Sequence, residues 1–409
     1  MTLRIGIDGR YIGDHYPGIG RYLFNLARAL PEASPDVEYF LLHNPRLRNT
    51  RHPIEELQQE QLRLVETAVP IRSLREQFAL PRIARQLRLH LFHAPYLVTA
   101  LHWPCPEVIN LYDLIPERHP QTLTNALARR YYRFVLETKR RRAAAILTLS
   151  EASKQELLRG HASCRGLARR LFVTPAAADP RFQPASAKAI AAAREELRLP
   201  HRYVLYLGTH RNHKNLVRLV DAWRMVSRAG ANGHVLVLAG REDPRFPEAR
   251  RRVHQLGLQN VSFPGEVAET RLAALYSAAS LFVLPSLSEG FGMPLLEAMA
   301  CGVPVACSAT SCLPEVAGDA AVQFDPTDTR SMAAAIAPLL NDERRRRRLA
   351  RRSLERAARF SWKRTAQLTF TAYGKALKMT QWAANRKELT VNEDSHDDQQ
   401  RVATTTNPP

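Results

Sequence analysis

The segment Pro285–Pro304, with the sequence PSLSEGFGMPLLEAMACGVP, decides the fold of this chain. It follows the apolar run Leu281–Leu284 and is typical of a strand, a glycine loop, a helix and a second strand. Pro294 suits the first turn of that helix, where the free N–H groups can hold an anion. Gly290 and Gly292 allow backbone amides to approach a ligand closely. The segment therefore predicts a binding loop at the carboxyl end of a buried strand.

Two glutamates lie in the same segment. Glu289 is in the loop and Glu297 is in the helix, so both can reach one ligand. A carboxylate accepts hydrogen bonds from two adjacent hydroxyls at once, as a sugar offers. The alternative for Glu297 is a helix acid that the helix dipole favours.

Strands and helices alternate on both sides of this segment, as in parallel sheets covered by helices. Strands are predicted first at Leu3–Ile7, Val37–Leu42, Leu91–Ala94, Val108–Leu111, Ala145–Leu149 and Leu171–Val173, with helices at Ser73–Gln86 and Asn125–Arg142. Later strands are predicted at Tyr203–Leu207, Val235–Ala239, Val261–Phe263, Leu281–Leu284 and Val303–Ala306, with helices at Asn215–Ser227, Glu269–Ala279, Pro294–Ala300 and Thr329–Leu340. We expect an α/β fold of two doubly wound, Rossmann-like domains that face each other across a cleft.

The expected domain boundaries follow from composition. Residues 1–180 form the N-terminal domain, and the proline- and alanine-rich residues 181–200 form a linker. Residues 201–360 form the C-terminal domain, and 361–385 form a last helix with Ser361 as its N-cap. The polar residues 386–409 are expected to be disordered.

Composition and charge narrow the class of protein. Apolar residues make up 45% and charged residues 24% of the 409 residues, which excludes wholesale disorder and fibrous structure. There is neither an apolar run of the ~18 residues that a membrane span needs nor a signal segment at Met1, so a cytoplasmic protein is expected. The 59 basic against 39 acidic residues give a net charge of +20, which implies an anionic partner. That partner could be nucleic acid, an anionic membrane surface or a phosphorylated substrate.

The segment Pro285–Pro304 resembles the donor site of the retaining glycosyltransferases of family 4, also known as glycosyl transferases group 1. These enzymes carry two glutamates around a Gly-Phe-Gly turn. Further stretches are similar to the same family: Asp8-Gly9-Arg10, Gly18–Tyr22, Asp113–Pro116, Gly265-Glu266-Val267, Ser311–Val316 and Phe360-Ser361-Trp362. The resemblance implies the two-domain GT-B fold, with residues 361–385 crossing back to the first domain as a closing helix. It also implies transfer of a hexose from a nucleotide sugar with retention of configuration.

The resemblance assigns roles in the donor site. Glu297 would bind the ribose hydroxyls. Glu289, with the amides of Gly290, Phe291 and Gly292, would hold the transferred hexose as a catalytic group. Gly265 and Val267 would belong to the loop that binds the base.

The donor diphosphate is expected after the strand Tyr203–Leu207, at Gly208, Thr209 and the catalytic Lys214. Positive charge there would stabilise the leaving diphosphate. The family usually has Arg-Lys before the asparagine, whereas this chain has His213 before Lys214. Arg211 either replaces the missing arginine or is one more surface arginine.

In the first domain, Gly18 and Gly20 would line the acceptor side. Tyr112 stands where the family often has a histidine that contacts the hexose, and it either donates a hydrogen bond or only packs. Asp113 is a candidate for orienting the acceptor hydroxyl. His93 and His119 flank this region, and a lone histidine is more often structural.

No D-x-D motif is evident, so neither a metal nor another cofactor is expected, and basic groups would replace the charge of a metal. The family mechanism is front-face substitution, in which the leaving phosphate helps to deprotonate the acceptor. A nucleotide-sugar epimerase and a glycoside hydrolase are the alternatives within enzymology. A nucleic-acid-binding protein is a remote alternative, since no RNP-like, zinc-finger or helix-turn-helix signature supports it.

The base, the hexose and the acceptor stay open. Mannosyl transfer from GDP-mannose in surface-polysaccharide assembly is the first expectation, with a glycan or polyprenyl-diphosphate-linked acceptor. The helix Asn125–Arg142 interleaves seven bases with three aromatic residues. It is either a patch for the inner face of an anionic membrane or a solvated face. The bases are Arg129, Arg130, Arg133, Lys139, Arg140, Arg141 and Arg142, and the aromatics are Tyr131, Tyr132 and Phe134.

Overall fold

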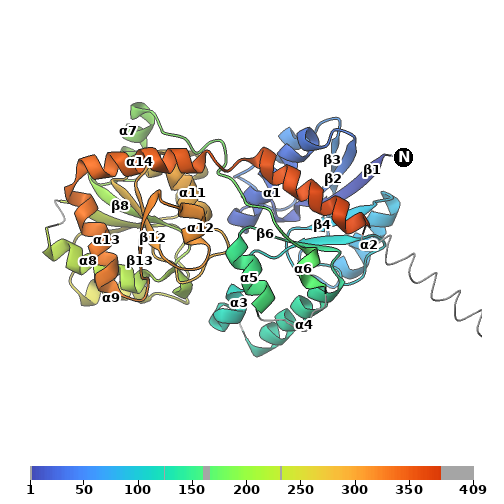
Figure 1. The fold of residues 1–409 in the computed structure, drawn as a ribbon, viewed down its shortest axis with the longest axis horizontal. Coiled ribbons are helices and arrows are strands. Elements are labelled where there is room, and N and C mark those ends of the chain that lie inside the picture. Colours follow the sequence, from blue (N-terminus) through green and yellow to red (C-terminus); the bar gives the residue numbers. More distant parts are fainter. Residues whose placement is uncertain (1, 124, 160–165, 231–232, 379–409) are drawn as a thin grey trace, which may run out of the picture.

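The computed structural model describes residues 2–123, 125–159, 166–230 and 233–378. Two α/β domains lie side by side, each built around one parallel sheet (Figure 1). This arrangement confirms the predicted fold class.

The first sheet has seven strands in the order β3-β2-β1-β4-β5-β6-β7, all parallel. Its strands are β1 Leu3–Asp8, β2 Val37–His43, β3 Leu62–Glu66, β4 Leu91–Ala94, β5 Glu107–Asn110, β6 Ala145–Thr148 and β7 Leu171–Val173. Its helices are α1 Pro17–Ala33, α2 Glu76–Gln86, α3 Ile115–Arg118, α4 Ala126–Arg142, α5 Glu151–Arg159 and α6 Leu167–Arg170. The strand order reverses beside β1, so ligand sites are expected at the carboxyl ends of β1 and β4.

The second sheet has six parallel strands in the order β10-β9-β8-β11-β12-β13. Its strands are β8 Tyr203–Leu207, β9 Val235–Ala239, β10 Val261–Gly265, β11 Leu281–Leu284, β12 Val305–Ser308 and β13 Ala321–Phe324. The helices of this half are α7 Ala187–Glu196, α8 Leu216–Arg228, α9 Glu248–Gln255, α10 Glu269–Ser277, α11 Met293–Ala300, α12 Leu313–Ala317, α13 Thr329–Asn341 and α14 Glu343–Ala357. The switch point lies between β8 and β11, which are the two strands that precede the predicted phosphate and hexose loops.

Two strands were not predicted, and both lie at sheet edges. β3 and β13 end their sheets, so fewer of their side chains are buried. In each of the two, a polar side chain, Arg63 or Gln323, interrupts the apolar run that would indicate a strand. Residues 181–200, which were predicted as a linker, contain α7, and this helix packs against α10. Ser186 caps α7 by accepting a hydrogen bond from the backbone N–H of Ala189.

The last helix, residues 362–378, crosses from the second domain to the first (Figure 1). Ser361 is its N-cap, as predicted, and accepts a hydrogen bond from the backbone N–H of Arg364 at 3.2 Å. Trp362 Nε1 donates to the Ala178 carbonyl at 3.0 Å. Residues 379–385 of the expected closing helix and the expected disordered tail 386–409 lie outside the described residues.

His93 joins this helix to the core of the first domain. Its Nε2 lies 2.7 Å from Asn110 Oδ1, which only accepts, so this nitrogen carries the proton. Its Nδ1 then accepts from the Tyr373 hydroxyl at 2.6 Å. Burial lowers the pKa of His93 to about 4, so the ring stays neutral and serves the packing.

Candidate active site

The loop between β11 and α11 reaches the first domain at Gly290. A Cβ on Gly290 would lie 2.7 Å from the Tyr112 carbonyl oxygen, so only glycine permits this approach. The Gly290 carbonyl accepts hydrogen bonds from the hydroxyls of Ser150 and Ser153 at 3.1 and 3.2 Å. Gly292, with φ of +83°, is the N-cap of α11. The predicted binding loop therefore lies directly against the first domain.

Glu289 and Lys214 form the centre of the predicted hexose and phosphate site. Lys214 Nζ donates to Glu289 Oε1 at 2.6 Å, and the Ser286 hydroxyl donates to the same oxygen at 2.6 Å. Asn215 holds the Lys214 loop in place with φ of +60° and donates to the carbonyls of Pro285 and Pro326. The structure thus brings together a base and a carboxylate that are 75 residues apart in the chain.

The other predicted phosphate residues lie around this pair. The side chain of Arg211 is 41% exposed and pairs with Asp243, with its Nε 3.5 Å from Oδ2, rather than with Glu289. The Thr209 carbonyl accepts a hydrogen bond from the Tyr206 hydroxyl at 3.0 Å. That hydroxyl lies 2.7 Å from where a Cβ on Gly208 would stand, so the loop packs closely there.

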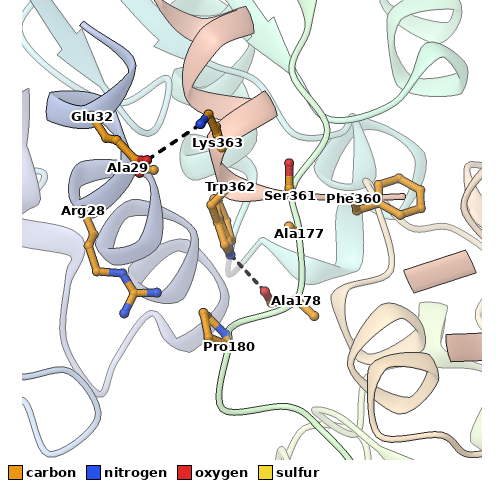
Figure 2. Close-up of a pocket in the computed structure, with 10 residues that line it drawn as sticks. All are labelled: Arg28, Ala29, Glu32, Ala177, Ala178, Pro180, Phe360, Ser361, Trp362 and Lys363. Atoms are coloured by element: carbon orange, nitrogen blue, oxygen red, sulfur yellow. Dashed lines mark hydrogen bonds and ion pairs between the residues drawn. The ribbon is translucent and has the colours of Figure 1, made fainter. Parts of the chain in front are cut away.

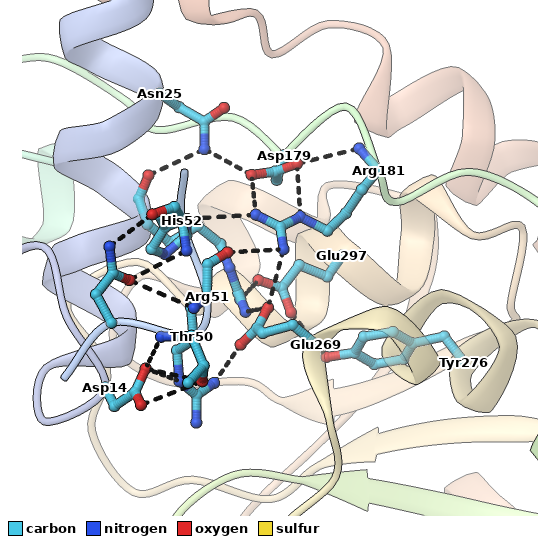
Figure 3. A network of polar contacts seen from close by, with 12 residues as sticks. Asp14, Asn25, Thr50, Arg51, His52, Asp179, Arg181, Glu269, Tyr276 and Glu297 are labelled. Atoms are coloured by element: carbon cyan, nitrogen blue, oxygen red, sulfur yellow. Dashed lines mark hydrogen bonds and ion pairs between the residues drawn. The ribbon is translucent and has the colours of Figure 1, made fainter. Parts of the chain in front are cut away.

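Glu297 is 1% exposed and contacts the first domain directly. Its Oε1 accepts from Arg21 of α1, and its Oε2 accepts from the Tyr276 hydroxyl at 2.9 Å (Figure 3). Burial raises the pKa of Glu297, while Arg21 and Tyr276 oppose the rise. Sequence reasoning gave Arg21 no role, because one arginine after a glycine loop does not stand out in so basic a chain.

Arg21 belongs to a cluster of arginines and glutamates that joins the domains, which we call the interdomain ion-pair cluster: Arg21, Arg51, Arg181, Glu266, Glu269 and Glu297. Arg21 Nη2 donates to Glu269 at 2.6 Å. Arg51 contacts Glu269 (Figure 3) and also Glu266. Although burial opposes it, the surrounding arginines lower the pKa of Glu269. The cluster neutralises charges that would otherwise be buried and unpaired.

A second contact joins the domains at α5. The Glu315 carboxylate accepts hydrogen bonds from the backbone N–H groups of Glu151 and Ala152, at 2.9 and 3.0 Å. A carboxylate at a helix N-terminus satisfies free N–H groups and interacts favourably with the helix dipole. A residue of the second domain therefore caps a helix of the first.

The residues predicted for the acceptor side of the site belong to the first domain, and each has its own environment. Burial, with a contribution from Glu289, raises the pKa of Asp113 to about 6, and its Oδ1 accepts from the Ile115 N–H at 2.9 Å. The Tyr112 hydroxyl is buried and has no hydrogen-bond partner among the described residues, while its ring meets Tyr22 edge-on. Gly20 packs α1 against the backbone at Tyr11, whereas Gly18 has open space around it.

The remaining predicted donor residues, Gly265, Val267 and Phe291, make contacts within the protein. Gly265 ends β10 with φ of +78°, and its carbonyl accepts from the Gly240 N–H at 2.8 Å. Val267 is buried after it. The ring of Phe291 meets that of Phe360 at a centroid distance of 5.8 Å.

A pocket of about 360 Å³ lies away from these residues, where the chain crosses between the domains. Figure 2 shows that α1, the segment 177–180 and the start of the last helix line it. Its lining includes Arg28, Trp362 and Lys363 but none of the predicted donor residues.

The predicted surface patch on α4 is wrong in part. Lys139 and Arg140 are buried; Lys139 Nζ donates to Glu107 Oε1 at 2.7 Å, and Arg140 lies 4.0 Å from Glu117. These two bases therefore do not share the face on which Leu127, Tyr131 and Phe134 are exposed. Arg130, Arg133, Arg141 and Arg142 are exposed.

The part of the chain that the structure describes offers neither a metal-binding group nor a membrane-spanning helix. Its His, Cys, Asp and Glu side chains form no group of three or more that could hold a metal ion. In the same residues, every helix is too short or too polar to cross a membrane.

Comparison with known proteins gives the family. The family model of Glycosyltransferase Family 4 matches residues 16–182, and that of Glycosyl transferases group 1 matches residues 189–356. The O-antigen chain mannosyltransferase B of Escherichia coli is 31% identical over 385 residues, which are 88% of this chain and 96% of that protein. The chain belongs to glycosyltransferase family 4. It is therefore a transferase enzyme.

Other relatives are similar to parts of this glycosyltransferase or to its fold. The MMP alpha-(1->4)-mannosyltransferase of Mycolicibacterium hassiacum is 32% identical over 61% of this chain and 59% of that protein. WaaG, a glycosyltransferase involved in lipopolysaccharide biosynthesis, covers 90% of this chain and 98% of its own, with a TM-score of 0.66 and 16% identity. The match to HepE of Anabaena, solved with UDP and glucose, covers 91% of this chain and 100% of HepE, with a TM-score of 0.68 and 19% identity. These neighbours confirm the GT-B fold.

Proposed function

We propose that this glycosyltransferase moves mannose from GDP-mannose to a glycan or a polyprenyl-diphosphate-linked acceptor, with retention, in the assembly of a surface polysaccharide. The similarity to an O-antigen chain mannosyltransferase over nearly the whole of both chains carries this proposal. Placement of Glu289, Lys214 and Glu297 at the face of the second domain that contacts the first supports it.

In the proposed mechanism, Lys214 releases the Glu289 carboxylate and pairs with the donor diphosphate instead. Negative charge grows on that diphosphate as the hexose leaves, so Lys214 would stabilise the transition state more than the ground state. The first N–H groups of α11 would add to this charge compensation. Glu289, with the amides around Phe291, would then hold the hexose hydroxyls.

The acceptor would enter from the first domain. Asp113 would orient its hydroxyl, and the leaving phosphate would take the proton in a front-face substitution. No metal takes part in this proposal. Glu297 would bind the ribose, which requires Arg21 to share or release this carboxylate because its present contacts leave it buried.

The proposal includes peripheral association with an anionic membrane. Leu127, Tyr131 and Phe134 recur along one exposed face of α4, and Leu74 and Phe78 are 86% and 80% exposed near the start of α2. Burial is the main cause of the raised pKa of Tyr131, and the Glu76 carboxylate of α2 is the next. Because Glu76 acts on Tyr131, α2 and α4 lie close together. Apolar side chains beside exposed arginines are typical of a surface that lies on anionic lipid.

The test is a panel of nucleotide sugars, scored first by thermal shift and then by transfer. GDP-mannose should give the largest shift and support transfer. Glu297→Gln should lower kcat/KM for the donor by ~10-fold or more, as expected for one charge-assisted hydrogen bond. Glu343→Gln, a first-turn helix acid on the surface, is the matched control and should leave kinetics unchanged. Equal kinetics for the two variants would overturn the assignment, and hydrolysis of the donor without acceptor would favour a hydrolase.

A further inference from the structure

Tyrosine side chains gather at the carboxyl edge of the first sheet. Tyr11 and Tyr16 follow β1, Tyr96 follows β4 and Tyr112 follows β5. The ring centroid of Tyr11 lies 5.0 Å from that of Tyr16 and 6.1 Å from that of Tyr96. Tyr16 and Tyr96 are only partly buried, so this tyrosine cluster reaches the surface. It lies where the strand order of the sheet reverses, which is the usual place of a ligand in such a fold.

Arg72, from the loop between β3 and α2, joins the tyrosine cluster. Its guanidinium carbon lies over two rings, 5.6 Å from the centroid of Tyr16 and 5.2 Å from that of Tyr96. These contacts restrict a long side chain whose guanidinium supplies N–H donors in a fixed geometry. Because Arg72 is exposed, it can offer these donors to a ligand at the mouth of the crevice.

The backbone at Arg72 is in the left-handed region, with φ of +60°, which residues other than glycine rarely adopt. Arg88 and Arg198 share this conformation, but each follows the end of a helix, where it is ordinary. Asn215 and Ser311 share it too, and both belong to the donor loops. No helix ends before Arg72, so it resembles the second pair, and backbone strain of this kind gathers at functional sites.

A polar atom without a partner lies beside the tyrosine cluster. The Tyr112 hydroxyl is buried and makes no hydrogen bond among the described residues. Burial raises the pKa of Tyr112, and neighbouring tyrosines, Tyr11 and Tyr96 among them, add to the rise. A buried hydroxyl normally has a hydrogen-bond partner, so this atom points to a ligand with polar groups.

The charges around the cluster favour a neutral ligand. Arg10 pairs with Asp8 and Glu76, so these two acids balance the charges of Arg10 and Arg72. Burial raises the pKa of Tyr11, and all four charged groups act on it as well, so they surround one ring. A sugar is neutral, its hydroxyls match tyrosine hydroxyls and arginine N–H groups, and its C–H groups pack on aromatic rings.

The cluster extends outward from the predicted place of the acceptor hydroxyl. Asp113 Oδ2 lies 3.2 Å from where a Cβ on Gly290 would stand, so this carboxylate faces the donor loop. Burial raises the pKa of Tyr96; Arg72 opposes the rise and Asp113 adds to it, so Tyr96 lies between these two charges. A sugar with its hydroxyl at Asp113 would therefore have the next sugar of its chain beside Tyr96 and Arg72.

We propose that Arg72, Tyr16 and Tyr96 bind the second sugar of the acceptor glycan, while the first sugar presents its hydroxyl to Asp113. This inference rests on the proposed function, and it deepens it by naming the acceptor as a glycan of at least two sugars. A single sugar would lack the contacts with Arg72 and the two tyrosines, so it would be a poor acceptor.

The experiment compares methyl glycosides of single sugars with methyl disaccharide glycosides that end in the same sugar. The panel ends in mannose, glucose, galactose or N-acetylglucosamine, in each common linkage. Every compound is tested for binding by saturation-transfer NMR without donor, and for transfer from GDP-mannose. For the best pair, kcat/KM of the parent should be at least ~10-fold higher with the disaccharide, as expected for one hydrogen bond to a charged group.

The variants identify the residues that produce this preference. Arg72→Gln should remove most of it, and Tyr96→Phe, which keeps the ring but not the hydroxyl, should reduce it. Arg75→Gln is the matched control, because Arg75 is an exposed arginine of the same segment, and it should keep the parental preference. Thermal melting shows that each variant is folded.

The subsite is overturned if no disaccharide is bound or used better than its single sugar. It is also overturned if Arg72→Gln keeps the parental preference or if Arg75→Gln loses it equally. In each of these cases transfer from GDP-mannose would leave the proposed function standing. If the disaccharides bind in a way that depends on Arg72 while no nucleotide sugar supports transfer, the proposed function is wrong and the glycan subsite stands.

Discussion

Arg21→Met should destabilise the protein strongly, although no role was predicted for Arg21 from the sequence. Arg21 contacts Glu297 and Glu269, and both carboxylates are buried. Methionine keeps the length and the apolar stem of the side chain but not its charge. After the change Glu269 still has Arg51 and Arg181, whereas Glu297 keeps only the Tyr276 hydroxyl.

The size of the loss follows from this difference. Breaking a buried ion pair on one side costs about 3–5 kcal/mol, because the remaining charge stays buried. We expect the lower end, ~3 kcal/mol, since the cost falls on one carboxylate that retains a hydrogen bond. For a domain of this size that lowers the unfolding midpoint by ~6–12 °C.

The loss should depend on pH. Burial already raises the pKa of Glu297, and Arg21 is the largest opposing influence, so the variant raises that pKa further. The folded variant then holds a proton that the unfolded chain releases, and stability falls as the pH rises through the folded pKa. The destabilisation should therefore be greatest at pH 8 and smaller at pH 5.

The assay is thermal unfolding followed by circular dichroism at pH 5, 6.5 and 8. Arg28→Met is the matched control, because Arg28 is exposed on the same helix and donates only to Asn25; its midpoint should change by no more than ~2 °C. The reasoning is refuted if the midpoint of Arg21→Met is as close to that of the parent as the midpoint of Arg28→Met. It is also refuted if the loss of stability grows towards pH 5, because the interdomain ion-pair cluster would then not hold Glu297 as described.

Three further predictions concern activity and membranes. Lys214→Ala should lower kcat by ~10- to 150-fold, because it removes a charge-assisted bond that strengthens as the diphosphate leaves. Arg211→Ala should have a smaller effect, since Arg211 is exposed and faces Asp243; a larger effect would mean that Arg211 replaces the family arginine. Transfer should persist in excess EDTA, because Lys214 and the N-terminus of α11 supply positive charge, and rescue by magnesium after loss would refute this. The protein should sediment with anionic but not neutral liposomes at low salt, each arginine contributing ~1 kcal/mol. Changing Arg129, Arg130 and Arg133 to glutamate should weaken sedimentation, and unchanged sedimentation would identify this face as merely solvated.

The sequence predicted the fold because both sheets are built from buried apolar runs that alternate with helices. It missed the edge strands β3 and β13, where Arg63 and Gln323 interrupt the apolar run. It also placed Lys139 and Arg140 on the surface of α4, because a run of bases does not reveal that Glu107 neutralises one of them inside the protein.

For the candidate site, the sequence indicated the loops but not their partners across the interface. Glu289 and Lys214 were predicted for one site, and the structure brings them into contact. Arg21, Ser150 and Glu315 contact the opposite domain through geometry that no local pattern records. Arg72 stayed unassigned because the two tyrosines that contact it are close only in the folded chain.

The carboxylate of Glu315 makes the first turn of α5 dependent on the position of the other domain. If the domains separate, the amides of Glu151 and Ala152 lose their acceptor and become open to solvent. Their exchange with deuterium would then depend on how often the domains part, even though both amides belong to the first domain. Exchange at these two backbone amides therefore reports opening between the domains in the native protein.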